Sequence, residues 1–96
     1  MASRIPKGRP AGSTTYDPDL AIAFGRAVLS LRTDAALSQA DLALHSNIER
    51  SHMGRIERGE NTPNLVAIVK IASALGCSAA DLVARFEKAL KASRRQ

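Results

Sequence analysis

The sequence predicts an all-α domain of five helices, and three observations support this fold class. Apolar residues recur at spacings of three and four between residues 17 and 92, which is the helical period. The chain is rich in Ala and Leu and holds only three aromatic residues and no Trp, a composition that favours helices over sheet. Several segments also begin with a capping residue and end at Gly or Asn. With 96 residues, the chain can form one domain with a small core.

The first helix is predicted to start at Asp17, which can cap it, with Pro18 at the first helical position and Asp19 favouring the helix dipole. Ile22 and Leu29 form a second apolar line, nearly opposite the core stripe. This line is interpreted either as scattered surface residues or as a contact with a partner subunit or with the chain's own last helix. The core stripe itself consists of Leu20, Phe24, Ala27, Val28 and Leu31.

The stretch from Leu37 to Gly59 predicts two short helices joined by a tight turn, roughly over 39–46 and 49–58. Ser38 is a good N-cap for the first of them. Asn47 lies in the turn, where the chain needs positive φ, and Gly59 ends the second helix. The inward positions are Leu42, Ala43, Met53 and Ile56.

The opposite side of the helix at 49–58 is polar and basic, with small residues at its centre. Such a surface lets a helix enter a major groove while long side chains reach the base edges. On a helical wheel this side contains Ser51, Arg55 and Arg58, with Gly54 and His52 flanking and Arg50 at the N-terminal tip.

Two more helices are predicted downstream. Pro63 stops the preceding helix, Asn64 caps the fourth helix, and Gly76 ends it. Ser78 and Asp81 resemble a capping box at the start of the fifth. The buried side of the fourth helix is Leu65, Ile68, Ile71, Ala72 and Leu75, and the apolar band of the fifth is Ala79, Leu82, Val83, Phe86, Ala89 and Leu90.

Phe86 and Leu90 extend past what a five-helix domain of this size needs for its core. They are expected to form a dimer interface, together with Ile22 and Leu29, and the alternative for Phe86 and Leu90 is packing on the first helix. Cys77 follows the end of the fourth helix and is interpreted as a small core hydrophobe rather than a redox site.

The net charge of +5 is concentrated at the two ends of the chain. Residues 1–16 are predicted to be a flexible basic arm, and residues 93–96 a basic tail. Within the arm, Lys7-Gly8-Arg9-Pro10 resembles the core of an AT-hook, so the arm either contacts a minor groove or DNA backbone or is a merely solvated tail. The excess positive charge suits a polyanionic partner.

Taken together, these motifs resemble the helix-turn-helix of the lambda repressor and Cro family, often called XRE-like. Asn47 replaces the family's usual turn Gly, Glu49 stands where Ser or Thr often starts the recognition helix, and Ala36 replaces a frequent Gly. We therefore expect a weaker N-cap at Glu49 and a less sharp end to the first helix. The matching segments are Phe24-Gly25, Leu31-Arg32, Leu37-Ser38-Gln39, Leu42-Ala43, Ser46-Asn47-Ile48, Arg50-Ser51, Arg55 to Gly59, Pro63-Asn64-Leu65, Leu75 to Ser78 and Asp81-Leu82.

The resemblance implies a lambda-repressor-like domain over 17–92, with the helix-turn-helix at 38–58 and an extended last helix. It implies sequence-specific binding of double-stranded DNA by a small homodimeric transcriptional regulator in a prokaryotic or phage-infected cytoplasm, associated with the nucleoid. A two-fold dimer would bind half-sites ~34 Å apart. A restriction–modification controller, a phage-type repressor and an antitoxin all fit, and so do activation and repression.

The resemblance also identifies site residues. Gln39 is similar to the family's Gln that binds the DNA backbone and braces the first residue of the recognition helix, here Arg50. Arg32 and Glu57 occupy positions that pair, so we predict a structural salt bridge between them. The DNA-binding residues expected are Gln39, Arg50, Ser51, His52, Arg55, Arg58, Asn61 and Thr62.

Catalytic chemistry is not expected from this sequence, so the protein is not predicted to be an enzyme. Two His and one Cys give no zinc-ligand spacing, and neither a metal nor a cofactor is expected. No apolar run is long enough for a membrane span, no signal peptide is recognised, and no small-molecule ligand is evident. Two alternatives stay open: a protein-interaction module such as an antitoxin or coactivator, and a non-specific DNA binder acting through its basic ends.

Overall fold

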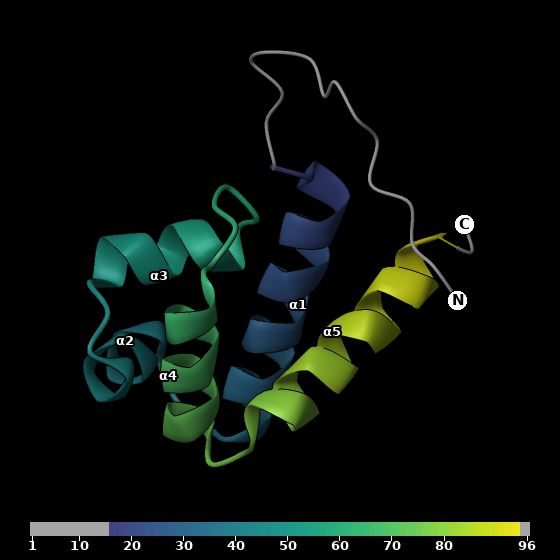
Figure 1. Ribbon diagram of the computed structural model, residues 1–96. Helices are drawn as coiled ribbons and strands as arrows, with labels where there is room; N and C mark the ends of the chain where they lie inside the picture. Colours follow the sequence, from purple (N-terminus) through teal and green to yellow (C-terminus); the bar gives the residue numbers. More distant parts are fainter. Residues whose placement is uncertain (1–15, 95–96) are drawn as a thin grey trace.

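The computed structural model describes residues 16–94, which form five helices and no strand, so the predicted all-α class is confirmed (Figure 1). The arm expected at 1–16 lies outside the described residues except for Tyr16, and residues 95–96 of the expected tail also lie outside them. The helices are α1 (Pro18–Asp34), α2 (Gln39–Ser46), α3 (Arg50–Glu57), α4 (Leu65–Leu75) and α5 (Ala79–Arg94).

Local capping sets most helix starts. The Asp17 carboxylate accepts from the amides of Asp19 and Leu20 at 3.0 and 3.2 Å. Ser38 and Asn64 accept from the third amide of α2 and of α4, at 3.0 and 2.9 Å. Ahead of α5, the Ser78 hydroxyl accepts from the Asp81 amide at 3.0 Å, while the Asp81 carboxylate accepts from the Ser78 amide at 3.3 Å. Each side chain satisfies backbone donors that the helix itself leaves free.

The end of α1 is sharper than the sequence predicted. The Ala36 amide donates to the Thr33 carbonyl and the Leu37 amide to the Arg32 carbonyl, both at 3.0 Å. This is a Schellman motif, and it holds Ala36 in the left-handed region at φ 57°. The two hydrogen bonds and the packing of Leu37 against the core offset the strain of an alanine in that conformation.

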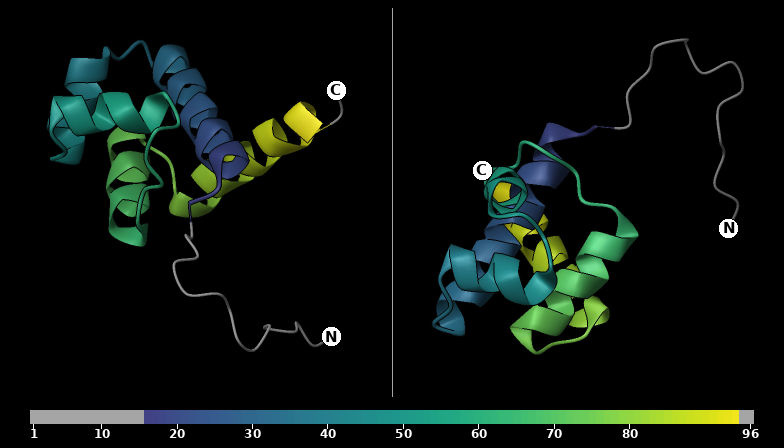
Figure 2. Two further views of the ribbon diagram at one scale, coloured as in Figure 1. Left: turned by 90° about the horizontal axis from the view of Figure 1, so that it is seen from above. Right: turned by 90° about the vertical axis from the view of Figure 1, so that its left-hand side faces the viewer.

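The chain passes from α1 into a compact group of three helices, and α5 then returns to cross α1 (Figures 1 and 2). The core lies where α1 meets this group. Its side chains of 0% exposure come from all five helices: Val28, Leu42, Met53, Ile56, Ile71 and Leu82. Because α3 contributes two of them, its rotation about its own axis is fixed, and its other side is turned outward.

Gly25 sets how closely α1 approaches α3. A Cβ at this position would lie 2.5 Å from the carbonyl oxygens of both Ile56 and Glu57, which are backbone atoms. No larger residue fits without moving α3 away from α1. The position of α3 therefore depends on this glycine.

The structure bears on two expectations about the C-terminal helix. Ser93 and Arg94, assigned to a tail, belong to α5, because neither Gly nor Pro ends the helix and cations are favourable in its last turn. Phe86 was thought to lie beyond the core, but its ring packs edge-on against Phe24 of α1, with ring centroids 6.1 Å apart. This is the packing on α1 that the sequence offered as the alternative for Phe86. The dimer interface expected at Phe86, Leu90, Ile22 and Leu29 stays a prediction.

Ile22 and Leu29 stay 39% and 43% exposed on the outer side of α1. Cys77 packs partly buried against the core, as expected, and this burial raises the pKa of its thiol.

Among the described residues, no single helix is both long and apolar enough to cross a bilayer. Only α4 and α5 taken together, across a 100° bend, meet that length and composition.

Candidate nucleic-acid interface

The outward side of α3 forms an open polar hollow with the start of α2. Arg50 and Ser51 are exposed on it, and Gly54 forms its floor beneath the side chains of Arg58 and Gln39. Figure 1 shows α3 along an outer edge of the molecule. The hollow has a volume of about 380 Å³ and is lined by Gln39, Arg50, Ser51, Gly54, Arg55 and Arg58.

A buried ionic brace lies behind this surface. Arg32 of α1 donates from Nε and Nη2 to the two carboxylate oxygens of Glu57, at 2.8 and 3.0 Å, which is the pairing expected from the sequence. The side chains of Arg32 and Glu57 are only 16% and 5% exposed. The hydrogen bond to Glu57 raises the pKa of Arg32 above its ordinary value, against the opposing effect of burial. Arg32 also donates to the Leu37 carbonyl at 3.0 Å, so one side chain joins α1, α3 and the entry to α2.

Gln39 completes the brace. Its amide nitrogen donates to Glu57 Oε1 at 3.0 Å, which ties the first residue of α2 to the last residue of α3. The bracing of Arg50 by Gln39, which the family resemblance implied, stays a prediction. In this structure the Gln39 amide nitrogen donates to Glu57, and Gln39 also lines the hollow.

Asn61 holds Arg55. In the amide orientation that satisfies both neighbours, Asn61 accepts from Arg55 Nε at 3.1 Å and donates to the Glu60 carbonyl at 2.9 Å. Arg55 is half-buried, and its guanidinium is thereby directed by the loop that follows α3. The structure therefore gives Asn61 a positioning contact that the sequence pattern did not indicate.

Arg58 is paired with Glu60. Its Nε donates to the carboxylate at 2.7 Å, and its Nη2 donates to the other oxygen at 3.3 Å. The hydrogen bond raises the pKa of Arg58 and lowers the pKa of Glu60. Both side chains are exposed, so the pair is accessible to solvent. Sequence reasoning missed Glu60, although a carboxylate two residues after Arg58 across a helix end is a usable signal.

Two predicted DNA-binding residues lie apart from the hollow. His52 faces the start of α4, in a depression shared with Asn64 and Lys70. Thr62 lies at the rim of an apolar pocket between α1, α4 and α5. At the start of α3, Glu49 makes no side-chain cap, as its residue type predicted.

This geometry agrees with what comparison with known proteins finds. Residues 23–86 match a family model described as a helix-turn-helix domain. The chain belongs to this helix-turn-helix family. The match spans α3 and the brace behind it and reaches Phe86, so it includes the elements that position the polar hollow.

Similar proteins of this family are regulators. The control protein C.MunI of a Mycoplasma species is 32% identical over 71 residues, covering 73% of this chain and 96% of that protein. The restriction-modification controller C.AhdI of Aeromonas hydrophila is 42% identical, with a TM-score of 0.63 over 67% of this chain and 96% of that one. The clp gene regulator ClgR of Corynebacterium glutamicum is 26% identical, with a TM-score of 0.76 over 80% and 82%.

Family membership confirms the resemblance and the function class drawn from the sequence. This helix-turn-helix protein is a sequence-specific DNA-binding regulator of transcription, and its relatives in the family are regulators rather than enzymes.

Proposed function

We propose that this helix-turn-helix protein binds double-stranded DNA as a homodimer, with α3 of each copy in the major groove of one half-site. The observation that carries the proposal is the hollow over α3. Three arginines and a serine converge there around a glycine, on a helix whose rotation and axis are fixed by Gly25 and by the brace at Glu57. Arginine guanidinium groups donate in a forked geometry, and holding them on a rigid helix suits the recognition of base edges.

Different residues of the hollow contact different parts of the DNA. Arg50 and Ser51, exposed at the helix start, read base edges, and a guanidinium at Arg50 can fork onto O6 and N7 of guanine. Arg55, held by Asn61, lies one turn further along and contacts a base or a phosphate. Arg58 contacts a phosphate. The first amides of α3, which Glu49 does not cap, and the Gln39 side chain add contacts to the DNA backbone.

The biological role we propose is control of a restriction–modification operon. Two controller proteins support it, since C.MunI and C.AhdI each align with this chain over 96% of their own length. A chain of this kind is regulated through its own concentration and through dimerisation. A reporter driven by DNA upstream of its own gene and of any adjacent methyltransferase or nuclease gene tests this role, and no response from either promoter would refute it.

The DNA contact is tested by selecting binding sites from random duplexes and then measuring the affinity of variants for the selected site. We expect a palindromic site with half-sites about one helical turn apart. Arg50→Ala should weaken binding to this site at least tenfold while changing binding to random duplex much less, because a bidentate base contact is worth ~1–3 kcal/mol.

Arg26→Ala is the matched control, since Arg26 is an exposed arginine of α1 and lies outside the hollow. This variant should lower the affinity for the selected site and the affinity for random duplex slightly and by the same factor. If the triple variant Arg50→Ala, Ser51→Ala, Arg55→Ala still prefers the selected site, α3 is not the recognition element. Loss of binding on deleting residues 1–16 and 91–96, with Arg50→Ala harmless, would instead identify a non-specific binder acting through its basic ends.

A further inference from the structure

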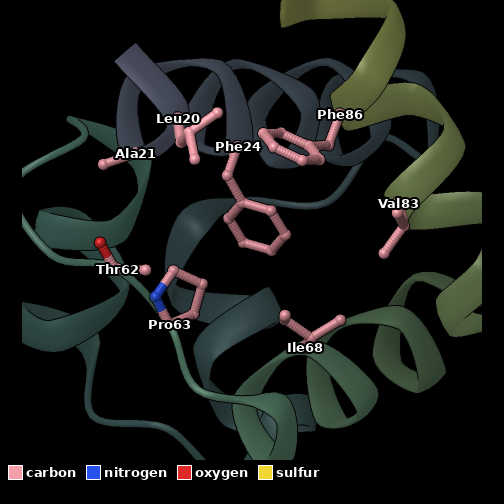
Figure 3. Close-up of a pocket in the computed structure, with 8 residues that line it drawn as sticks. All are labelled: Leu20, Ala21, Phe24, Thr62, Pro63, Ile68, Val83 and Phe86. Atoms are coloured by element: carbon pink, nitrogen blue, oxygen red, sulfur yellow. The ribbon is translucent and has the colours of Figure 1, made fainter. Parts of the chain in front are cut away.

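A groove lies between α1 and α5, on the side of this helix pair away from its aromatic contact. The contact side is the apolar hollow of Figure 3, where Phe24 and Phe86 meet. Arg26 lies about 200° around α1 from Phe24, and so faces the other way. Lys88 is related to Phe86 in the same way on α5. The groove, which we call the cationic groove, has a volume of about 440 Å³, and its lining includes Arg26, Ser30, Arg85, Lys88, Ala89 and Ala92.

The polar groups of the cationic groove lie at two levels. The helices α1 and α5 run in opposite directions (Figure 1), and the Arg85 guanidinium donates across the groove to the Ser30 hydroxyl at 2.9 Å. Arg26 precedes Ser30 by one turn of α1, and Lys88 follows Arg85 by about one turn of α5. Each level therefore combines a polar side chain of α1 with a cation of α5, and the levels are about 5.4 Å apart.

The level of Arg26 and Lys88 carries positive charge without a counter-charge. Both residues are exposed, and within the described part of the chain neither side chain makes a hydrogen bond or an ion pair. At the other level, Arg85 is 3.7 Å from the Asp34 carboxylate, which is 68% exposed and largely screened by water. Cations that face the same groove repel each other, so an anion bound between them would lower the energy.

The floor between the two walls is made of small side chains. Ala27 is buried there, and Ala89 and Ala92 add only methyl groups, so the space between the cations stays open. A phosphate group suits it better than a carboxylate, because it carries about 1.5–2 negative charges and three acceptor oxygens and takes forked bonds from arginine. The volume is also within the usual range for small-molecule sites, about 300–1,000 Å³.

We propose that the cationic groove binds a diphosphate group, as free pyrophosphate or as part of a small nucleotide. One phosphate lies between Arg26 and Lys88, and the other accepts from Arg85, whose contact with Ser30 holds the guanidinium in the groove. Two levels one turn apart match two linked phosphates, whereas a duplex needs cations that follow its backbone over a longer path. The site goes beyond the proposed DNA contact, since no residue lines both the cationic groove and the hollow over α3.

Isothermal titration of the full chain with sodium pyrophosphate tests the proposal, at an ionic strength matched with sodium chloride. We expect one pyrophosphate per chain, with a dissociation constant below about 1 mM that rises with added salt. Inorganic phosphate should bind at least about tenfold more weakly, because it occupies only one of the two levels. Bound pyrophosphate should also raise Tm, since it binds only the folded chain.

Variants locate the binding. The double variant Arg26→Ala, Lys88→Ala should raise the dissociation constant for pyrophosphate at least about tenfold, because it removes the level without a counter-charge. Ala92→Glu should do the same by placing a carboxylate in the cationic groove, and position 92 is exposed, so the fold is kept. Lys70→Ala is the matched control, since Lys70 is an exposed cation of α4 outside the groove, and its dissociation constant should stay within about twofold of the wild type.

Several outcomes would overturn the proposal: no saturable binding of pyrophosphate below about 10 mM, equal binding of inorganic phosphate, or unchanged binding by both groove variants. Loss of binding in Arg50→Ala alone would place the pyrophosphate in the hollow over α3. Displacement of pyrophosphate by a saturating DNA duplex would make the groove part of the DNA contact, which also overturns it. ADP distinguishes the two sources, since tighter binding of ADP than of pyrophosphate supports a nucleotide and the reverse supports free diphosphate. A chain that binds pyrophosphate but selects no DNA would refute only the proposed function.

Discussion

Replacing Glu57 by alanine is the most informative perturbation of the scaffold. The carboxylate accepts three hydrogen bonds, two from Arg32 and one from Gln39, and its side chain is 5% exposed. Breaking a fully buried pair from one side costs about 3–5 kcal/mol. Arg32 keeps 16% exposure and can regain some water, so we expect the lower end, about 3 kcal/mol. For a domain of this size that lowers Tm by roughly 15 °C.

The assay is urea unfolding followed by far-UV circular dichroism, on a double-mutant cycle with Arg32→Ala. Because the second substitution removes a group already stranded by the first, the coupling energy should be about 2 kcal/mol. Glu57→Gln keeps the volume and separates lost charge from lost packing. If the two single effects simply add within about 0.5 kcal/mol, the pair does not brace α3 and the reasoning is refuted.

The exposed pair Arg58–Glu60 supplies the control cycle, and it should show no measurable coupling, since solvent screens it. Glu57→Ala should also leave the selected DNA sequence unchanged below its Tm, because Glu57 lies behind the recognition surface. A changed sequence preference with unchanged stability would assign Glu57 to the DNA contact instead.

Three further predictions concern the backbone and the charge of the site. Ala36→Gly should stabilise the domain by about 1 kcal/mol, because it removes the strain of an alanine in the left-handed region. Gly76→Ala should destabilise the domain by about the same amount, because Gly76 has φ 78° and the new Cβ would have nothing within 4 Å. If urea unfolding shows that both variants change the free energy of unfolding in the same direction, the strain argument is contradicted. Gly25→Ala should destabilise the domain by more than about 2 kcal/mol and weaken DNA binding, because two backbone carbonyls must move. A variant with the wild-type Tm would show that α1 and α3 are not in this contact. Glu60→Gln should free Arg58 to contact a phosphate, so the affinity for any DNA duplex should rise. In gel-shift titrations, the slope of log K against log salt concentration should steepen by up to about one unit. An unchanged slope would mean that Arg58 does not contact DNA.

The sequence by itself determined the five helices and most of their starts. Asp17, Ser38, Asn64 and the pair Ser78–Asp81 each act on amides two or three residues away, so residue type and spacing suffice to predict them. The rotation of α3 also followed from its two buried apolar positions. Family motifs supplied the Arg32–Glu57 pair, which spacing alone would not have found.

The tertiary structure decided what those helices bring together. Asn61 reaching Arg55 and Gln39 reaching Glu57 depend on how a loop and a second helix pack against α3. Phe86 belongs to the core because α5 crosses α1 at Phe24, and a wheel drawn for one helix cannot give the angle at which two helices cross. Capping and periodicity are local properties of the chain, whereas contacts between distant residues depend on the packing of whole helices.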